Sequence, residues 1–135
     1  MPAGINEATP AGATAFVKYY FRSIALSFYT RDARVIRSLS HPTCRTCERY
    51  IRSIASIKAA NQHVSPGFGF QITFAAAPAL VDGTASVDLI FNTPTVRLLS
   101  TSGVVVHTEK AARGVAETVL LRRRRQSWVV TEITG

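Results

Sequence analysis

The chain has 135 residues, a length typical of one domain with a single hydrophobic core. Sixteen Lys and Arg residues against eight Asp and Glu residues give a net charge of +8, which favours anionic partners without selecting one class of them. No run approaches the roughly 18 to 20 apolar residues that a membrane-spanning helix requires, so the sequence predicts no such helix.

The first twelve residues are rich in Pro, Ala, Gly and Thr, and they lack the basic and apolar regions of a secretory signal. This composition is typical of a flexible tether that follows a removed signal or lipid-anchor segment. A fragment expressed with a new initiator methionine would look the same. We therefore predict a tether over residues 1–12 and a single domain over residues 13–135.

Three helices are predicted in the first half of the chain. Apolar residues at a spacing of four form a wide stripe over residues 13–29. A short second helix is expected around Val35, Ile36 and Leu39. Thr43 is positioned to cap a third helix, which residues 61–63 end. The inward face of that helix is predicted to comprise Cys47, Tyr50, Ile51, Ile54 and Ile57.

After Ser65 the apolar period changes to two, as in half-buried strands. The segments with this pattern are 68–74, 86–91, 96–99, 104–108, 115–123 and 128–133, which gives about four to six strands. No helix is predicted between successive strands, so a doubly wound parallel sheet is disfavoured. The sequence predicts an α+β fold with three helices packed on a curved antiparallel sheet.

This order of elements, which ends in a strand containing Trp128, resembles the nuclear transport factor 2-like superfamily, in which a sheet wraps around a long first helix. Residues 9–20, the segment Leu39 to Cys47 with its Pro-x-Cys-x-x-Cys spacing, and residues 128–132 are also similar to an uncharacterised actinobacterial family of lipid-anchored or secreted proteins. The resemblance implies a cone-shaped extracytoplasmic domain with a lipid anchor upstream of Met1. It implies no activity.

Cys44 and Cys47 stand at the start of the predicted third helix. A Cys-x-x-Cys pair at a helix amino terminus is the geometry of a dithiol oxidoreductase, because the helix dipole lowers the pKa of the thiols. A structural disulfide is favoured instead, since the βαβ context of a thioredoxin-like motif is missing. Zinc is disfavoured because His41, His63 and His107 lack a paired spacing. A disulfide would indicate a compartment outside the reducing cytosol.

The run Arg122, Arg123, Arg124 and Arg125 is the strongest charge feature and is expected at a strand end or turn, because a strand alternates the direction of its side chains. Together with Arg113, the run would form a patch for anionic lipid headgroups, a cell-envelope polymer or nucleic acid. Nucleic acid is disfavoured because stacking aromatic residues are scarce nearby. The alternative is a solvated edge that discourages aggregation between strands.

A cone of this kind can hold a cavity between helices and sheet. The polar residues considered for it are Tyr19, Tyr20, Asp88, His107, Glu117 and Glu132. Asp88 lies in the middle of a predicted strand, where burial would raise its pKa to suit a general base, and Tyr20 is its candidate acid-base partner. Asp88 fits equally well on a solvent-exposed face opposite Val87 and Leu89, and that reading is favoured.

We therefore predict a non-enzymatic extracytoplasmic binding or accessory domain with a basic surface, whose partner is an anionic envelope component or a protein. No metal or cofactor is expected. The alternative is a small-molecule enzyme of isomerase or cyclase type that uses the cavity, on the strength of superfamily analogy. A homodimer through the open sheet face is compatible with both functions. A cavity filled by aromatic side chains would argue against the enzyme.

Overall fold

The structure is a computed structural model and describes residues 4–135. Three helices come first: α1 (Pro10–Thr30), α2 (Arg34–Leu39) and α3 (Arg45–Ala59). The strands that follow are β1 (His63–Val64), β2 (Gln71–Ala76), β3 (Thr84–Thr93), β4 (Val96–Leu99), β5 (Val105–Glu109), β6 (Ala112–Arg124) and β7 (Ser127–Thr134). The larger sheet has the order β2-β3-β6-β7 and the smaller one the order β1-β4-β5, with antiparallel pairing throughout.

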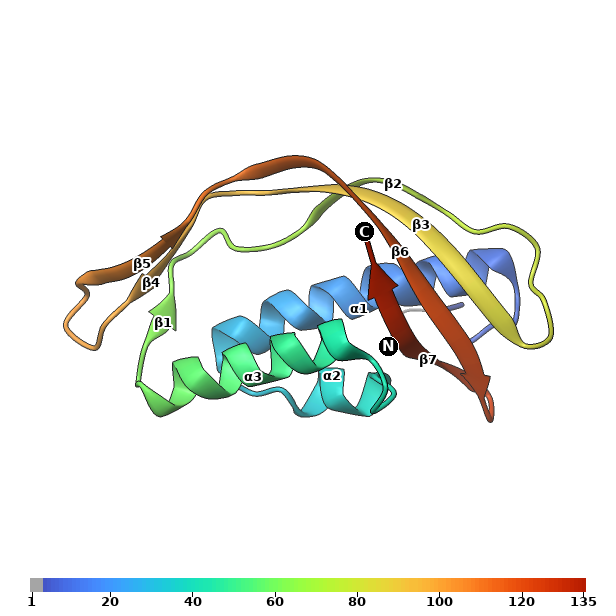
Figure 1. The fold of residues 1–135 in the computed structure, drawn as a ribbon, viewed down its shortest axis with the longest axis horizontal. Coiled ribbons are helices and arrows are strands. Elements are labelled where there is room, and N and C mark those ends of the chain that lie inside the picture. Colours follow the sequence, from blue (N-terminus) through green and yellow to red (C-terminus); the bar gives the residue numbers. More distant parts are fainter. Residues whose placement is uncertain (1–3) are drawn as a thin grey trace.

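The larger sheet is curved, and the helices lie along its concave side (Figure 1). The predicted α+β architecture, with helices packed on antiparallel strands, is confirmed. The two-residue strand β1 was not predicted, because residues 61–63 read as the end of a helix. Among residues 4–135, no helix is both long and apolar enough to cross a membrane.

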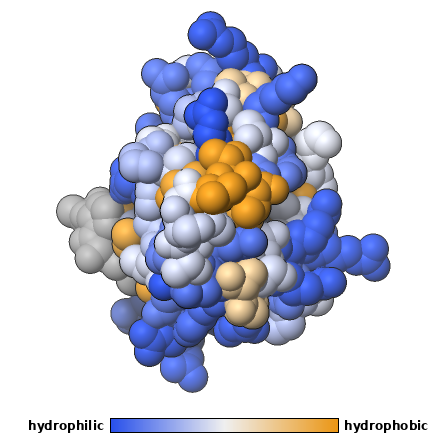
Figure 2. Space-filling model, turned by 90° about the vertical axis from the view of Figure 1, so that its left-hand side faces the viewer, coloured by the Kyte–Doolittle hydropathy of each residue, from blue (hydrophilic) through white to orange (hydrophobic). Residues whose placement is uncertain are grey.

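The hairpin β4–β5 continues the ribbon formed by β3 and β6. Residues 94–95 link β3 to β4, and residues 110–111 link β5 to β6. The two links are adjacent, and the amide of Ala111 donates a hydrogen bond to Thr95 Oγ1 at 3.3 Å. The ribbon bends there and the hairpin projects from one end of the molecule (Figure 1). Figure 2, which views the molecule from this end, shows an apolar patch surrounded by hydrophilic side chains.

The core lies between α1, α3 and the concave face of the larger sheet. Its largest fully buried side chains include Trp128, Tyr20, Phe16 and Phe21. From β3, alternate residues Val87, Leu89 and Phe91 point into it, as the period of two predicted. The space between α1, α3 and the larger sheet is therefore filled by side chains, many of them from α1.

The segment before α1 differs from the predicted tether. Residues 10–12 form the first turn of α1, because Thr9 caps the helix through the amide of Gly12 and Pro10 fits the first helical position. Ile5 is 1% exposed and belongs to the core cluster. The Trp128 indole donates a hydrogen bond to the carbonyl oxygen of Glu7 at 3.0 Å. The tether prediction is therefore wrong for residues 4–12, and residues 1–3 lie outside the described part.

Two local predictions were also wrong. Cys44, not Thr43, is the N-cap of α3, and its sulfur accepts a hydrogen bond from the amide of Cys47 at 3.2 Å. Phe68 and Phe70 precede β2 and are not part of it. Phe74 lies within β2 but is 50% exposed, because a bulge between Ile72 and Phe74 shifts the register.

Candidate functional site

A groove of about 800 Å³ lies between α3 and the smaller sheet. Small-molecule sites in proteins fall in the range of about 300 to 1,000 Å³. Residues 62–70 and the hairpin β4–β5 form its other walls, at the end of the molecule from which the hairpin projects (Figure 1). The lining is mainly apolar, and its apolar members are Phe28, Tyr50, Ile57, Val64, Phe68, Phe70, Pro94, Val96, Leu98 and Ala112.

Aromatic rings form a connected floor in this groove. The ring of Phe28 lies 5.3 Å from that of Phe68 and 6.3 Å from that of Tyr50, with near-perpendicular planes. Phe68 in turn lies 5.7 Å from Phe70, and Phe70 lies 4.9 Å from the buried Phe21. Edge-to-face pairs of this kind stabilise each other beyond their buried area. The floor is therefore anchored on the core and is preorganised.

The charged side chains around the groove are mostly basic. Arg49 and Arg52 come from α3, and Lys110 follows β5. The acidic member of the lining is Glu109, whose carboxylate lies 2.9 Å from the Nε2 atom of His107. An apolar floor with a basic rim suits a ligand that has an apolar body and an anionic group.

Behind the groove lies a half-buried glutamate. Glu117 pairs with the buried Leu89, so its side chain points to the concave side of the sheet. Its Oε1 atom is buried and has no hydrogen-bond partner within residues 4–135, and burial raises the pKa of the carboxyl group. Burial also raises the pKa of the Tyr50 hydroxyl, with further contributions from Glu117 and Tyr20. Glu117 therefore sits close to the groove without lining it.

Tyr20 and Asp88, the weak catalytic candidates, are not brought together. The Tyr20 hydroxyl is buried at 2.7 Å from Ser40 Oγ, and burial raises its pKa to about 12. Ser40 donates to the carbonyl oxygen of Ile36, so the pair joins α1 to the end of α2. Asp88 is exposed on the other face of the sheet, where it accepts a hydrogen bond from Thr118 at 2.7 Å. The prediction that Tyr20 and Asp88 form an acid-base pair in one cavity is therefore wrong.

The other polar candidates are dispersed. His107 lines the groove. Tyr19 is half-buried against the core, and Glu132 accepts a hydrogen bond from the amide of Ile133 at 2.9 Å. No cluster of three or more His, Cys, Asp or Glu residues able to hold a metal occurs in residues 4–135.

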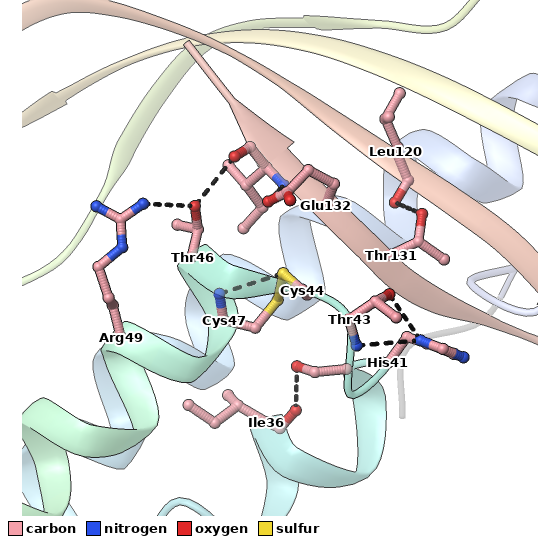
Figure 3. Close-up of a disulfide and its surroundings, with 12 residues drawn as sticks. Ile36, His41, Thr43, Cys44, Thr46, Cys47, Arg49, Leu120, Thr131 and Glu132 are labelled. Carbon is pink, nitrogen blue, oxygen red and sulfur yellow. Dashed lines mark hydrogen bonds between the residues drawn. A yellow bond between two sulfur atoms is a disulfide. The ribbon is translucent and has the colours of Figure 1, made fainter.

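Cys44 and Cys47 form a disulfide, as predicted, with their Cα atoms 5.2 Å apart. It closes the first turn of α3 (Figure 3). Both residues are 1% exposed, so the bond is shielded from a partner thiol. Thr46, one residue before Cys47, donates to the carbonyl oxygen of Ile133 at 3.0 Å and ties the same turn to β7. The disulfide is therefore built into the packing of α3 on the sheet.

The arginine surface differs from the predicted patch. Arg113 pairs near the Thr93 end of β3 and Arg122 with Thr84 at the other end, so they lie on the order of 30 Å apart. Arg123 packs over the Trp128 ring at 4.7 Å and donates to the carbonyl oxygen of Asn6. Arg124 donates to the carbonyl oxygen of Ser38. Arg123 and Arg124 therefore hold neighbouring segments, although Arg124 is exposed, as are Arg122 and Arg125.

Sequence reasoning expected a cavity between helices and sheet, with His107 among its residues, but missed the aromatic side chains that form the groove. Phe28 was not singled out, and Tyr50 and Phe70 were expected to fill the core. The signal was present in Pro66-Gly67 and Gly69, which interrupt the strand pattern around Phe68. Gly67 has a φ of +95°, a left-handed conformation that glycine adopts easily.

Comparison with known proteins reveals a family and a fold. A scan against protein-family models matches residues 1–134 with DUF6318, a family of unknown function. No curated protein gives a significant match.

Several solved structures are similar over nearly the whole chain. The intermembrane-space region of the chloroplast protein ARC6 has a TM-score of 0.65 at 11% identity, over 90% of this chain and 92% of that one. A putative calcium/calmodulin-dependent protein kinase II association domain from Xanthomonas campestris has a TM-score of 0.52 at 13% identity, over 92% and 84%. An uncharacterised protein with a cystatin-like fold from Caulobacter vibrioides has a TM-score of 0.50 at 9% identity, over 90% and 87%. At these identities the likeness shows the fold alone, an α+β arrangement of helices packed on antiparallel strands.

Proposed function

Since the chain belongs to the DUF6318 family, whose function is unknown, we propose from its geometry that it is a non-enzymatic extracytoplasmic binding domain. Its ligand has an apolar body and an anionic group and lies in the groove between α3 and the smaller sheet. The observation that carries this proposal is the anchored aromatic floor beneath a basic rim, in a groove of about 800 Å³.

The proposed extracytoplasmic location is based on the disulfide. Such bonds persist outside the reducing cytosol, and this one is buried in the packing of α3. The resemblance of the Pro-x-Cys-x-x-Cys segment to lipid-anchored or secreted actinobacterial proteins points the same way. Arg122 and Arg125 add exposed positive charge at the far end of the domain, which suits an anionic envelope nearby.

The groove is tested with 8-anilinonaphthalene-1-sulfonate, a fluorescent probe that combines apolar rings with an anionic sulfonate. Ser56 lies on the exposed side of α3 and lines the groove, whereas its exposed neighbour Ala55 does not. A bulky side chain at position 56 would therefore occupy the groove without disturbing the core. We expect the wild type to bind the probe, Ser56→Trp to bind it at least tenfold more weakly, and the matched control Ala55→Trp to bind it as the wild type does.

Equal binding by Ser56→Trp and the wild type would place the probe elsewhere and contradict the proposal. A second experiment tests whether the groove recognises the anionic group of its ligand. We expect Arg52→Gln to weaken binding of the sulfonate probe but not of uncharged N-phenyl-1-naphthylamine. Arg52 lines the groove and is an exposed residue of α3, so its loss leaves the core intact.

The small-molecule enzyme remains a second candidate because of Glu117. A half-buried carboxyl group with a raised pKa, next to Tyr50 of the groove lining, is a feature of acid-base sites. The Kemp elimination of 5-nitrobenzisoxazole reports a base in an apolar site. A rate above that of Glu117→Gln would favour the enzyme, and equal rates would remove this candidate.

A further inference from the structure

The outer edge of β5 is unpaired within residues 4–135. The smaller sheet has the order β1-β4-β5, so β5 contacts β4 on one side and has no strand on the other. All five residues of β5 are exposed. The adjoining Val104, together with Val105 and Val106 of the strand, is 61%, 48% and 49% exposed respectively.

Natural proteins protect free edges with charges, prolines or covering segments, because an open edge pairs with other chains. The three valines carry no such protection. They belong to the hairpin that projects from the end of the molecule shown in Figure 2, where the apolar patch is seen. Exposed β-branched residues on an open edge favour the addition of another strand.

The direction in which the main-chain groups of β5 point follows from the hydrogen bonds of β4. The amide and the carbonyl group of Arg97 in β4 both bond to Ser65, on the β1 side of the strand. Arg97 is paired with Thr108, so the two residues form a non-hydrogen-bonded pair. The amide and carbonyl group of Thr108 therefore point away from β4, towards the free edge.

The side chains of an added strand would alternate between two environments. Val96, Leu98, His107 and Glu109 line the groove, which shows that this face of the smaller sheet is the groove wall. Every second residue of an added strand would extend that wall towards Arg49, Arg52 and Lys110. The basic rim favours acidic side chains at some of these positions, and the valines favour apolar ones.

We propose that β5 receives an extended segment of a partner protein, rich in apolar and acidic residues, which joins the smaller sheet as a fourth strand through the main-chain groups of Thr108. This interaction does not depend on a ligand in the groove. Its specificity comes from alternate side chains, while the main-chain hydrogen bonds supply a sequence-independent part of the affinity.

The test uses the complete chain and a display library of random seven-residue peptides. We expect enrichment of sequences that combine β-branched or other apolar residues with Asp or Glu. The matched variants are Thr108→Pro, which removes the outward amide but no hydrogen bond to β4, and Thr108→Ala, which keeps that amide. Enriched peptides should bind Thr108→Ala as they bind the wild type and Thr108→Pro at least tenfold more weakly.

A second pair of variants tests the charge if Thr108→Pro fails to fold. Val106→Glu should weaken binding of the acidic peptides at least fivefold, whereas Val106→Lys should not weaken it. The absence of enrichment, or equal binding by Thr108→Pro and Thr108→Ala, would overturn the proposal. So would a wild-type dimer in sedimentation that Thr108→Pro converts to a monomer, because a second copy would then occupy the edge. Probe binding in the groove is measured separately, so failure of one proposal leaves the other standing.

Discussion

Truncation of Ile5 to alanine distinguishes a packed amino-terminal segment from a tether. Ile5 is 1% exposed and contacts the core that contains Trp128. Removal of a buried Ile side chain costs about 2 to 5 kcal/mol, and its position before the first helix lets the segment relax, which favours the lower part of that range. We expect Ile5→Ala to lower the free energy of unfolding by about 2 to 3 kcal/mol, which corresponds to a fall in Tm of roughly 6 to 12 °C for a domain of this size.

The assay is urea unfolding followed by the fluorescence of Trp128 and by circular dichroism. Glu7→Ala is the control, because Glu7 accepts the indole hydrogen bond through its main-chain carbonyl oxygen and keeps that bond after truncation. Its stability should stay within about 0.5 kcal/mol of the wild type, as for most surface substitutions. If Ile5→Ala is equally neutral, the segment contributes nothing to the core and the tether prediction is correct after all.

Three further predictions concern buried groups. Reduction of the Cys44–Cys47 disulfide, with the thiols left free, should lower stability by about 2 kcal/mol in calorimetry, because the closed loop is short; complete unfolding would contradict this. Tyr20→Phe should cost about 1 to 2 kcal/mol in urea unfolding, since Ser40 loses a buried partner, and an unchanged stability would mean that water replaces it. The raised pKa of Glu117 means that the unfolded state releases its proton first, so wild-type stability should fall as pH rises above the ordinary glutamate value. Glu117→Gln should lack this fall in unfolding measured from pH 4 to 8, and identical slopes would refute the assignment.

Periodicity along the chain predicted the fold class, because buried stripes are local patterns. The stripe over residues 13–29 and the alternation of Val87, Leu89 and Phe91 both mark faces that are buried in the structure. The disulfide followed from the spacing of two cysteines and the lack of a redox context. These inferences needed no knowledge of which distant segments meet.

The candidate site could not be predicted in the same way, because it depends on long-range register. Arg113 and Arg122 are close in sequence but stand at opposite ends of β6. The groove forms where Phe68 leaves the strand pattern and packs edge-to-face against Phe28, a contact between residues forty positions apart. The role of Ile5 was hidden by the composition around it, since a Pro/Ala/Gly/Thr-rich segment carries no periodic signal.

The hairpin β4–β5 is held at both of its ends. Its two short links, residues 94–95 and 110–111, are joined by the hydrogen bond from Ala111 to Thr95. At its turn, Thr101 donates a hydrogen bond to the carbonyl oxygen of Asn61, just beyond α3. The wall of the groove and the free edge of β5 belong to this hairpin. The same contacts therefore set both the width of the groove and the orientation of the β5 edge.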